Sequence, residues 1–321
     1  MKLYTETEKN EMFFEDIKDC LTHNDMNTVI EKSAAHWAFP DPDSSLTKFQ
    51  EVGIACHEAI LDENQFNAKY ARMPSAEDFP GAITSLKGMR DYLVKVGRKG
   101  FSNKPYDVLL QAIKEIGDSV VVMQEVQDIF SKNNSEKQAI AGKDFDRIVT
   151  MRKSIYADQE YSKLLSGGVA GLVYVGEIDV DGELCKVKAT PDLVTNSGAI
   201  INYITATIAK PEKVNRDLNS DRISFQGNTA FPLLKAALEI DAFYEYYGQY
   251  PSEYILLYQE KSYPHVAQAF RLTDWHVEVG RKQYQEAIKH LQHCMQQNSY
   301  PAYGSGIIDL EVPEWSGLVG E

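Results

Sequence analysis

The sequence predicts an α/β protein in which a mixed β-sheet is flanked by helices and a helical N-terminal half packs on that sheet. Two observations lead to this prediction. Up to about residue 165 most apolar residues recur at helical spacing, whereas β-branched and aromatic runs typical of strands begin after Ser166-Gly167-Gly168. The elements then follow the order hairpin, strand, helix, two strands and helix, and strands that alternate with helices are typical of a helix-covered sheet.

In the N-terminal half, the pattern predicts helices separated by turns. Residues 8–40 read as helical and end at a Phe-Pro-Asp-Pro turn, since proline does not continue a helix. Thr47 is a good N-cap for a second helix with an apolar stripe. Residues 74–81 contain two prolines and a glycine and read as a loop. Further helices are predicted up to residue 165, with turns at residues 97–105 and 133–135.

The C-terminal half supplies the predicted sheet. Asp181-Gly182 is a two-residue hairpin signal between two strand-like runs. The predicted strands are residues 169–180, 183–189, 198–207, 254–260 and 265–272. The predicted helices are residues 231–247, ended by Gly248, and residues 275–297. The last helix is expected to point five apolar residues inward: Trp275, Val279, Ile288, Leu291 and Met295.

Length and composition fit a folded protein with a sizeable core. The chain has 321 residues, of which 43% are hydrophobic and 25% are charged, so disorder over the whole length is excluded. We divide it into a helical N-terminal region, residues 1–165, and an α/β core, residues 166–321, and expect the two to form one compact unit.

The net charge of the chain limits the kinds of partner that it can bind. With 33 basic and 47 acidic residues, the net charge of −14 argues against a broad, sequence-independent grip on nucleic acid, although a small local basic channel stays open. No apolar run approaches a membrane span of about 20 residues, and no signal peptide is readable. The four cysteines follow no metal-binding spacing, so we expect a cytoplasmic chain with reduced thiols.

Several short motifs occur in a characteristic order. Gly53–Glu58 reads G-I-A-C-H-E on a predicted helix and contains His57, and Lys186–Leu193 reads K-V-K-A-T-P-D-L and contains Asp192. Pro264–Ala267 and the helix with Gly280 and Tyr284 complete the series. Over most of its length the chain therefore resembles the RecE (exonuclease VIII)-like branch of the PD-(D/E)XK nuclease superfamily.

The resemblance implies a metal-dependent nuclease site. In that family a divalent metal, Mg2+ or Mn2+, is held by oxygen ligands from a hairpin Glu, the Asp of the P-D motif and a D/E-x-K strand, and a Q-x-x-x-Y helix steadies the site. The residues that match here are Asp192, as the catalytic and metal-binding carboxylate, and His57, as a metal ligand. The resemblance also implies homo-oligomers, because active members form rings.

Four positions depart from the family pattern. Gly171 stands where we align the hairpin Glu, Asn202 replaces the second acid, and Ile204 replaces the lysine. The helix that should read Q-x-x-x-Y has Lys235 at its first motif position. Losing two anionic ligands and the lysine should cost on the order of several kcal/mol of metal affinity and transition-state stabilisation. We therefore interpret Asp192 as the vestige of a decayed site.

Each candidate residue also has a simpler structural interpretation. His57 is equally explained as a core histidine, and Asp192 as a turn residue that accepts backbone hydrogen bonds. The candidates for contact with DNA phosphates are Lys186, Lys188 and Lys235. For the first two, a polar strand face is an equally good interpretation. The aromatic residues at positions 243–258 fit a packing layer better than base stacking, and the acidic run Glu6–Asp19 fits a solvated helix face.

Three hypotheses for function follow from the resemblance and its departures. The leading one is a catalytically inactive RecE-like pseudonuclease, of phage or mobile-element type as relatives often are, that works in the host cytoplasm. It would bind a protein partner, for example as an anti-defence inhibitor of a host complex. The second is an active Mg2+-dependent double-strand DNA exonuclease in recombination, with migrated acids around Asp192. The third is a DNA-end-binding scaffold without cleavage.

Overall fold

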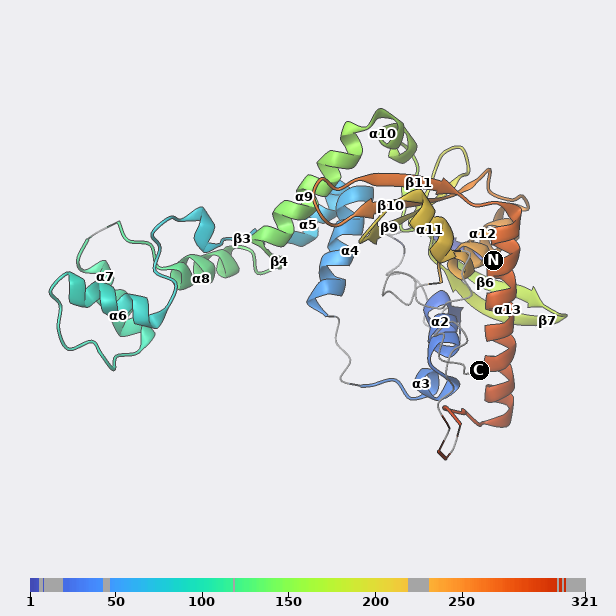
Figure 1. The fold of residues 1–321 in the computed structure, drawn as a ribbon, viewed down its shortest axis with the longest axis horizontal. Coiled ribbons are helices and arrows are strands. Elements are labelled where there is room, and N and C mark those ends of the chain that lie inside the picture. The colour runs from blue at the N-terminus through green and yellow to red at the C-terminus, as the bar shows by residue number, and fades with distance from the viewer. Residues whose placement is uncertain are drawn as a thin grey trace, which may run out of the picture.

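A computed structural model of the chain describes residues 1–5, 8, 20–42, 47–117, 119–218, 231–304, 306, 307 and 309. It confirms a mixed α/β fold (Figure 1). Apart from Glu8, the acidic run Glu6–Asp19 lies outside the described residues. Among the described helices, none is both long and apolar enough to cross a membrane.

The first sheet has five strands and carries most of the predicted core. Its order is β11-β10-β9-β8-β5. The bounds are β5 Val169–Ala170, β8 Leu193–Val194, β9 Ile200–Ala206, β10 Tyr254–Glu260 and β11 Ala267–Arg271. Strands β9 and β10 are parallel, with Asn202 opposite Leu256, and the other neighbours are antiparallel. The predicted strands at residues 198–207, 254–260 and 265–272 therefore form a mixed sheet, as expected, while the predicted hairpin lies in a second sheet.

The second sheet is built on the predicted hairpin. Strands β6 (Val173–Val180) and β7 (Glu183–Ala189) are joined by Asp181 and Gly182, whose φ values of 55° and 86° suit the tight turn that this dipeptide predicts. Two strands from the N-terminus extend the hairpin on either side, β1 (Lys2–Tyr4) on β6 and β2 (Leu21–Thr22) on β7. The first residues of the chain thus belong to the α/β core.

The prediction of one helical run over residues 8–40 is wrong in the described part. After β2, helix α2 (His23–Glu31) begins at a capping box, in which the Asp25 carboxylate accepts a hydrogen bond of 2.7 Å from the Thr22 N–H. Helix α3 (Ala34–Ala38) follows with Ser33 as its N-cap. Local capping by these hydroxyls therefore divides a segment whose composition alone reads as one helix.

Helices cover both faces of the five-stranded sheet, and β9 shows how the faces differ. Ile200 and Ile204 pack with α12 (Pro232–Tyr247), α13 (Asp274–Gln297) and α2 in one hydrophobic core. Ile201 and Tyr203 pack on the other face. The helices of that second core are α4 (Lys48–Leu61), α5 (Glu63–Lys69), α9 (Gly142–Ala157) and α10 (Gln159–Leu165). Helix α11 (Pro211–Leu218) joins the first core through Val214.

Helices α12 and α13 approach each other closely at a glycine. A Cβ placed on Gly280 would lie 2.0 Å from the Leu233 carbonyl oxygen, so only glycine fits there. This contact decides which face of α13 turns inward, and Tyr284 and Ile288 are buried. The prediction that Trp275 and Met295 point inward is wrong, because they are 57% and 41% exposed.

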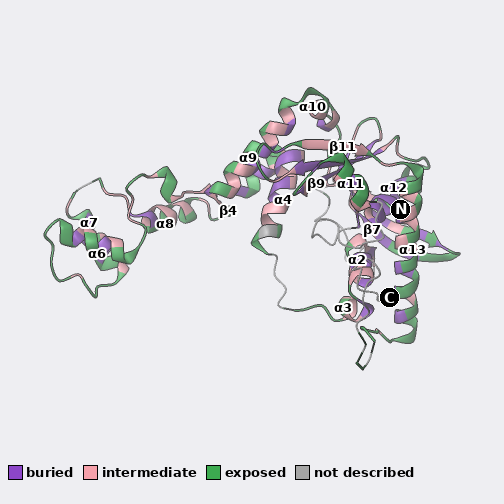
Figure 2. Cartoon of the chain, viewed as in Figure 1, coloured by how far each residue is buried: buried purple, intermediate pink, exposed green. Residues whose placement is uncertain are grey.

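An arm of helices projects from the body (Figure 1). It leaves through β3 (Tyr70–Met73), which pairs in parallel with β4 (Gln138–Ala141) where the arm returns. Between them lie η2 (Ala76–Asp78), α6 (Leu86–Lys95), α7 (Tyr106–Lys114) and α8 (Met123–Asn133). The arm has a small hydrophobic core of its own: Met89, Leu93, Leu109, Ala112, Ile113 and Val122. Figure 2 shows buried segments on α6 and α7 at its end.

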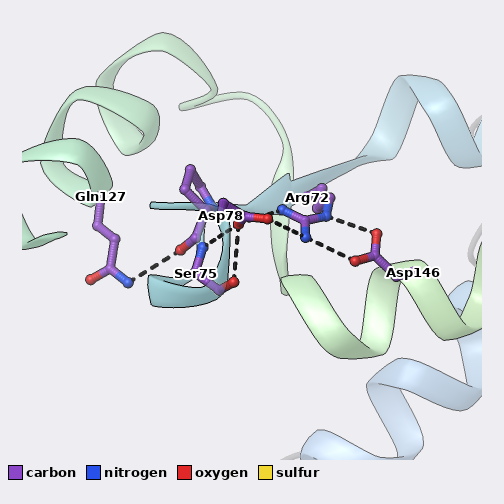
Figure 3. A network of polar contacts seen from close by, with 6 residues as sticks. Arg72, Ser75, Asp78, Gln127 and Asp146 are labelled. Carbon is purple, nitrogen blue, oxygen red and sulfur yellow. Dashed lines mark hydrogen bonds and ion pairs between the residues drawn. The ribbon is translucent and has the colours of Figure 1, made fainter. Parts of the chain in front are cut away.

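Ion pairs fasten the base of the arm (Figure 3). The Arg72 guanidinium on β3 donates two hydrogen bonds of 2.8 Å to Asp78 in η2 and two of 2.8 Å to Asp146 in α9. These bonds hold the pKa of Asp78 and that of Asp146 below their usual range. Gly142 leaves room for the guanidinium, since a Cβ there would lie 3.2 Å from its Cζ.

Candidate functional site

The predicted site residues from three distant parts of the chain meet beside β9. Asp192 lies directly before β8, which pairs with β9 so that Leu193 is opposite Ile201. This register places Asp192 beside the middle of β9, where the Tyr203 N–H donates a hydrogen bond of 2.8 Å to its Oδ2. Asn202 points to the opposite face from Tyr203, toward helix α12, because side chains alternate along a strand.

Lys235 on α12 is the centre of the cluster. Its Nζ donates hydrogen bonds of 2.9 Å to Asp192 Oδ1 and 2.9 Å to Asn202 Oδ1, and it lies 3.6 Å from Glu239 Oε1. Burial opposes the charge, but the carboxylates of Asp192 and Glu239 outweigh it and raise the pKa of Lys235. The sequence suggested Lys235 for contact with DNA, whereas its ammonium is directed into the cluster.

His57 on α4 closes the other side of Asp192. Its Nδ1 lies 3.5 Å from Asp192 Oδ2, and its ring packs edge-to-face on Tyr203 with a centroid distance of 5.0 Å. Burial lowers the pKa of His57 despite the nearby carboxylate. For Asp192 burial acts to raise the pKa, and the Lys235 ammonium, with the hydrogen bonds from Lys235 and the Tyr203 N–H, overcomes it, so the pKa of Asp192 is lowered.

Glu239 is the second carboxylate of the cluster and is almost completely buried. It lies one helical turn after Lys235, is 1% exposed, and accepts a hydrogen bond of 2.6 Å from the Tyr254 hydroxyl on β10. Burial raises the pKa of Glu239 to about 7, although Lys235 opposes this shift. Near neutral pH, Glu239 is therefore only partly ionised.

A buried polar network behind the cluster holds β9 in place. The Tyr203 hydroxyl donates a hydrogen bond of 2.7 Å to Gln259 Oε1 on β10 and lies 3.4 Å from Cys56 Sγ on α4. The Gln259 amide in turn donates to the Met151 carbonyl oxygen at 2.9 Å. Because these groups satisfy one another, the backbone that orients Asp192 is fixed from the opposite face of the sheet.

The remaining positions from the motif comparison add no charged group to the cluster. Ile204 lies on the same face of β9 as Asn202 and packs into the apolar core. Gly171 lies at the break between β5 and β6 with a φ of 68°, and its N–H donates to the Asp192 carbonyl oxygen at 3.2 Å. Lys186 is exposed on the hairpin opposite Glu177, and Lys188 is half-buried on the same strand.

Two residues of the site, Glu239 and His23, escaped the sequence analysis. His23 is the first residue of α2, and it lies close enough to Lys235 and Asp192 to feel both charges. Burial and the Lys235 charge lower the pKa of His23 to about 4. Helix α2 reaches the site because β2 pairs with β7, and the sequence holds no local signal of that pairing.

The donor set does not fit a catalytic divalent metal. Within the described residues, no three His, Cys, Asp or Glu side chains gather so that they could hold a metal ion. Both oxygens of Asp192 already accept hydrogen bonds, and Asn202 supplies a neutral amide in place of a carboxylate. The Lys235 ammonium lies between these two side chains, where a cation between two strand ligands would be expected.

The fold and this cluster define a domain of the PD-(D/E)XK nuclease type. The family model described as a PDDEXK-like domain of unknown function (DUF3799) matches residues 32–311, so the chain belongs to this family. The superfamily resemblance expected from the motifs is thereby confirmed. A search among curated proteins gives no match.

One solved structure shows the same fold at low sequence identity. The chain is similar to a "Putative exonuclease" from Eubacterium rectale, with a TM-score of 0.55 and 11% identity over 100% of both chains. A structure described as SSO0001 aligns over 74% of this chain and 86% of its own length, with 10% identity and a TM-score of 0.26. At these identities the first comparison shows the shared fold, and the second carries no argument.

Proposed function

We propose that this nuclease-type domain acts by binding and not by metal-dependent cleavage of DNA. The observation that carries the proposal is the position of the Lys235 ammonium, 2.9 Å from both Asp192 and Asn202. An ammonium held there neutralises the one ionised carboxylate that a metal would need. A divalent cation entering the cluster would have to displace Lys235 and leave a positive charge buried.

The charge of the whole cluster supports this proposal. Asp192 contributes one negative charge and Lys235 one positive charge, while burial keeps His57 neutral and Glu239 partly protonated near pH 7. Such a set is close to neutral, whereas hard divalent cations are drawn to sites with several ionised oxygen ligands. Glu239 Oε1 is buried without a hydrogen bond, 3.6 Å from Lys235 Nζ, but the hydrogen bonds among Lys235, Asp192 and Asn202 join strand and helix without metal.

Two kinds of partner fit such a protein. A closed site is compatible with a protein partner, such as a host defence complex inhibited by a phage-encoded pseudonuclease, and with DNA ends held without cleavage. In both cases the contacts are made by surfaces outside the closed Asp192 cluster.

A second candidate is favoured by one specific observation. Asn202 and Ile204 lack the expected acid and lysine, but Lys235 and Glu239 bring a lysine and a carboxylate into the same cluster from helix α12. If charged groups have migrated from strand to helix, the chain is an active Mg2+-dependent exonuclease acting in recombination. The raised pKa of Glu239 weighs against it, as does the lack, among the described residues, of a third acid placed to hold a metal with Asp192 and Glu239.

Incubation of the purified protein with linear duplex DNA and Mg2+ or Mn2+ tests the proposal. We expect no digestion by the wild type, and no difference between the wild type and Asp192→Ala. Metal-dependent digestion that disappears in Asp192→Ala would establish the exonuclease instead. Digestion that persists in Asp192→Ala would be assigned to a contaminating nuclease, so that comparison is the essential control.

A further inference from the structure

The distal end of the arm concentrates positive charge in an otherwise acidic chain. Between Ser85 and Pro105 the sequence has six lysine or arginine residues and one acidic residue, Asp91, a local balance of +5. Because the whole chain carries −14, the remainder carries −19. We call α6 with the following residues 96–105 the basic lobe. Its cations are Lys87, Arg90, Lys95, Arg98, Lys99 and Lys104.

Five of these six cations are exposed and have no described counter-ion. No described carboxylate forms an ion pair with Lys87, Lys95, Arg98, Lys99 or Lys104. Elsewhere in the arm, Lys114 pairs with Glu125 and Arg72 pairs with two aspartates, whereas Lys132 and Lys137 have no described carboxylate partner. The charge of the basic lobe is therefore presented to the solvent and is not used within the fold.

The basic lobe is a supported surface and not a loose tail. Met89 and Leu93 on α6 are buried against Leu109 and Ile113 on α7, in the hydrophobic core of the arm. The sixth cation, Arg90, turns back and donates a hydrogen bond of 3.2 Å to the Lys104 carbonyl oxygen, which ties α6 to the loop. Helices α6 and α7 form the end of the arm farthest from the two sheets (Figure 1).

We propose that the basic lobe binds the phosphate backbone of double-stranded DNA. Exposed cations without counter-ions attract a polyanion. Their binding is favourable because it releases the counterions condensed on the polyanion. The net charge of −19 on the remainder repels such a polyanion, so the contact is confined to the lobe and the arm holds the duplex away from the acidic body. The net negative charge of the whole chain does not exclude a local basic surface of this kind.

The composition of the basic lobe favours a nucleic acid over a protein surface. Protein interfaces depend on aromatic or apolar anchors buried at their centre. In the lobe, Tyr92 and Phe101 are half-buried within the arm, and the exposed apolar side chains, Leu86, Val94 and Val96, include no aromatic ring and are fewer than the exposed cations. Contacts made mainly by lysine and arginine side chains position a protein on the phosphate backbone without reading sequence. We therefore expect binding that is independent of sequence and sensitive to salt.

Anisotropy of a labelled, blunt-ended duplex, measured in EDTA so that cleavage is excluded, tests this inference. The variant is Lys95→Gln/Arg98→Gln/Lys99→Gln. The matched control, Lys153→Gln/Lys163→Gln/Lys282→Gln, removes the same charge from exposed body lysines that have no described ion pair. We expect the lobe variant to lose at least about tenfold in affinity and to lower the salt slope by roughly 2.7, at about 0.9 per lost phosphate contact. The control should bind like the wild type.

Three results would overturn the inference. They are no duplex binding by the wild type at low salt, equal losses in both triple variants, and a concentration-dependent self-association that only the lobe variant abolishes. The last result, seen by sedimentation, would assign the lobe to the acidic surface of a second copy. Because no divalent metal is present, the outcome is independent of whether the Asp192 cluster cleaves DNA. Circular dichroism melts of the variants check that the exposed substitutions leave the fold intact.

Discussion

Lys235 on α12 and Asp192 before β8 form a partly buried ion pair of 2.9 Å that joins the helix to the sheet. Under the proposed function, this pair takes the place of the metal–carboxylate contact expected for a nuclease of this fold. Because the ammonium is also bonded to Asn202, the side chains at the two positions aligned with metal ligands, Asp192 and Asn202, both accept hydrogen bonds from Lys235. Substitutions in the cluster, between α12 and α13, and at the base of the arm test this arrangement and the packing around it.

Removing one partner of the pair should destabilise the fold more than removing both. Lys235→Met leaves the Asp192 charge buried without its partner, and we expect it to lower the free energy of unfolding by about 3 kcal/mol or more. Lys235→Met/Asp192→Asn should recover a large part of that loss. Urea unfolding of the two single variants and the double variant gives the coupling energy, and strictly additive effects would contradict the pairing.

The ionisation of Glu239 should make stability depend on pH. Its folded-state pKa is raised to about 7 from the ordinary value of 4.5, so the folded state binds more protons than the unfolded state between these values. The contribution of Glu239 is therefore fully present below pH 4.5 and is lost as pH rises toward 7, by on the order of 3 kcal/mol at most.

Comparison with Glu239→Gln isolates that contribution. His23, whose folded-state pKa is lowered to about 4, acts in the opposite direction because its neutral form is favoured on folding. The difference in unfolding free energy between wild type and Glu239→Gln cancels the histidine contribution. We expect this difference to change between pH 5 and pH 7.5 in favour of the variant, and a constant difference would refute a buried, protonated Glu239.

Two helical glycines should respond to alanine in opposite directions. Gly280→Ala should destabilise the protein by about 3 kcal/mol or more, because the new Cβ would lie 2.0 Å from the Leu233 carbonyl oxygen on α12. Gly53→Ala, in a helix with no atom within 4 Å of its Cβ position, should stabilise it by up to about 1 kcal/mol. Thermal melts of both variants measure these changes in stability, and equal effects would mean that α12 and α13 do not pack as described.

The attachment of the arm should depend on the forked geometry of Arg72. Arg72→Lys keeps the charge but cannot bond both Asp78 and Asp146 through paired N–H groups. We expect faster proteolysis in the segments that flank β3 and β4. Arg147→Lys is the control, because Arg147 pairs with Asp144 three residues earlier in the same helix. Equal cleavage of both variants would show that Arg72 does not fasten the arm.

Where pairing signals are local, the sequence predicted the fold well. Strands 183–189 and 254–260 match their predicted bounds, because one follows a hairpin turn and the other is a continuous apolar run. Strands β1 and β2 were not predicted, since runs of two or three residues become strands only through pairing with the distant hairpin. The independent core of the arm also depends on contacts that periodicity does not reveal.

The sequence identified most residues of the candidate site but did not reveal how they are arranged. The motif order identified Asp192, His57, Asn202 and Lys235, while the direction of the Lys235 side chain and the burial of Glu239 depend on how α12 packs on β9. One signal was available, a lysine and a glutamate one turn apart in an otherwise apolar helix segment. Such a spacing indicates a buried ion pair facing a partner charge.

Calorimetric titration of the purified protein with Mn2+ at neutral pH tests the central claim most directly, because it measures whether the Asp192 cluster accepts a cation. With Lys235 in place, the wild type should show no saturable binding beyond that of Asp192→Ala. One-to-one binding by the wild type that is lost in Asp192→Ala would contradict a cluster closed by the Lys235 ammonium.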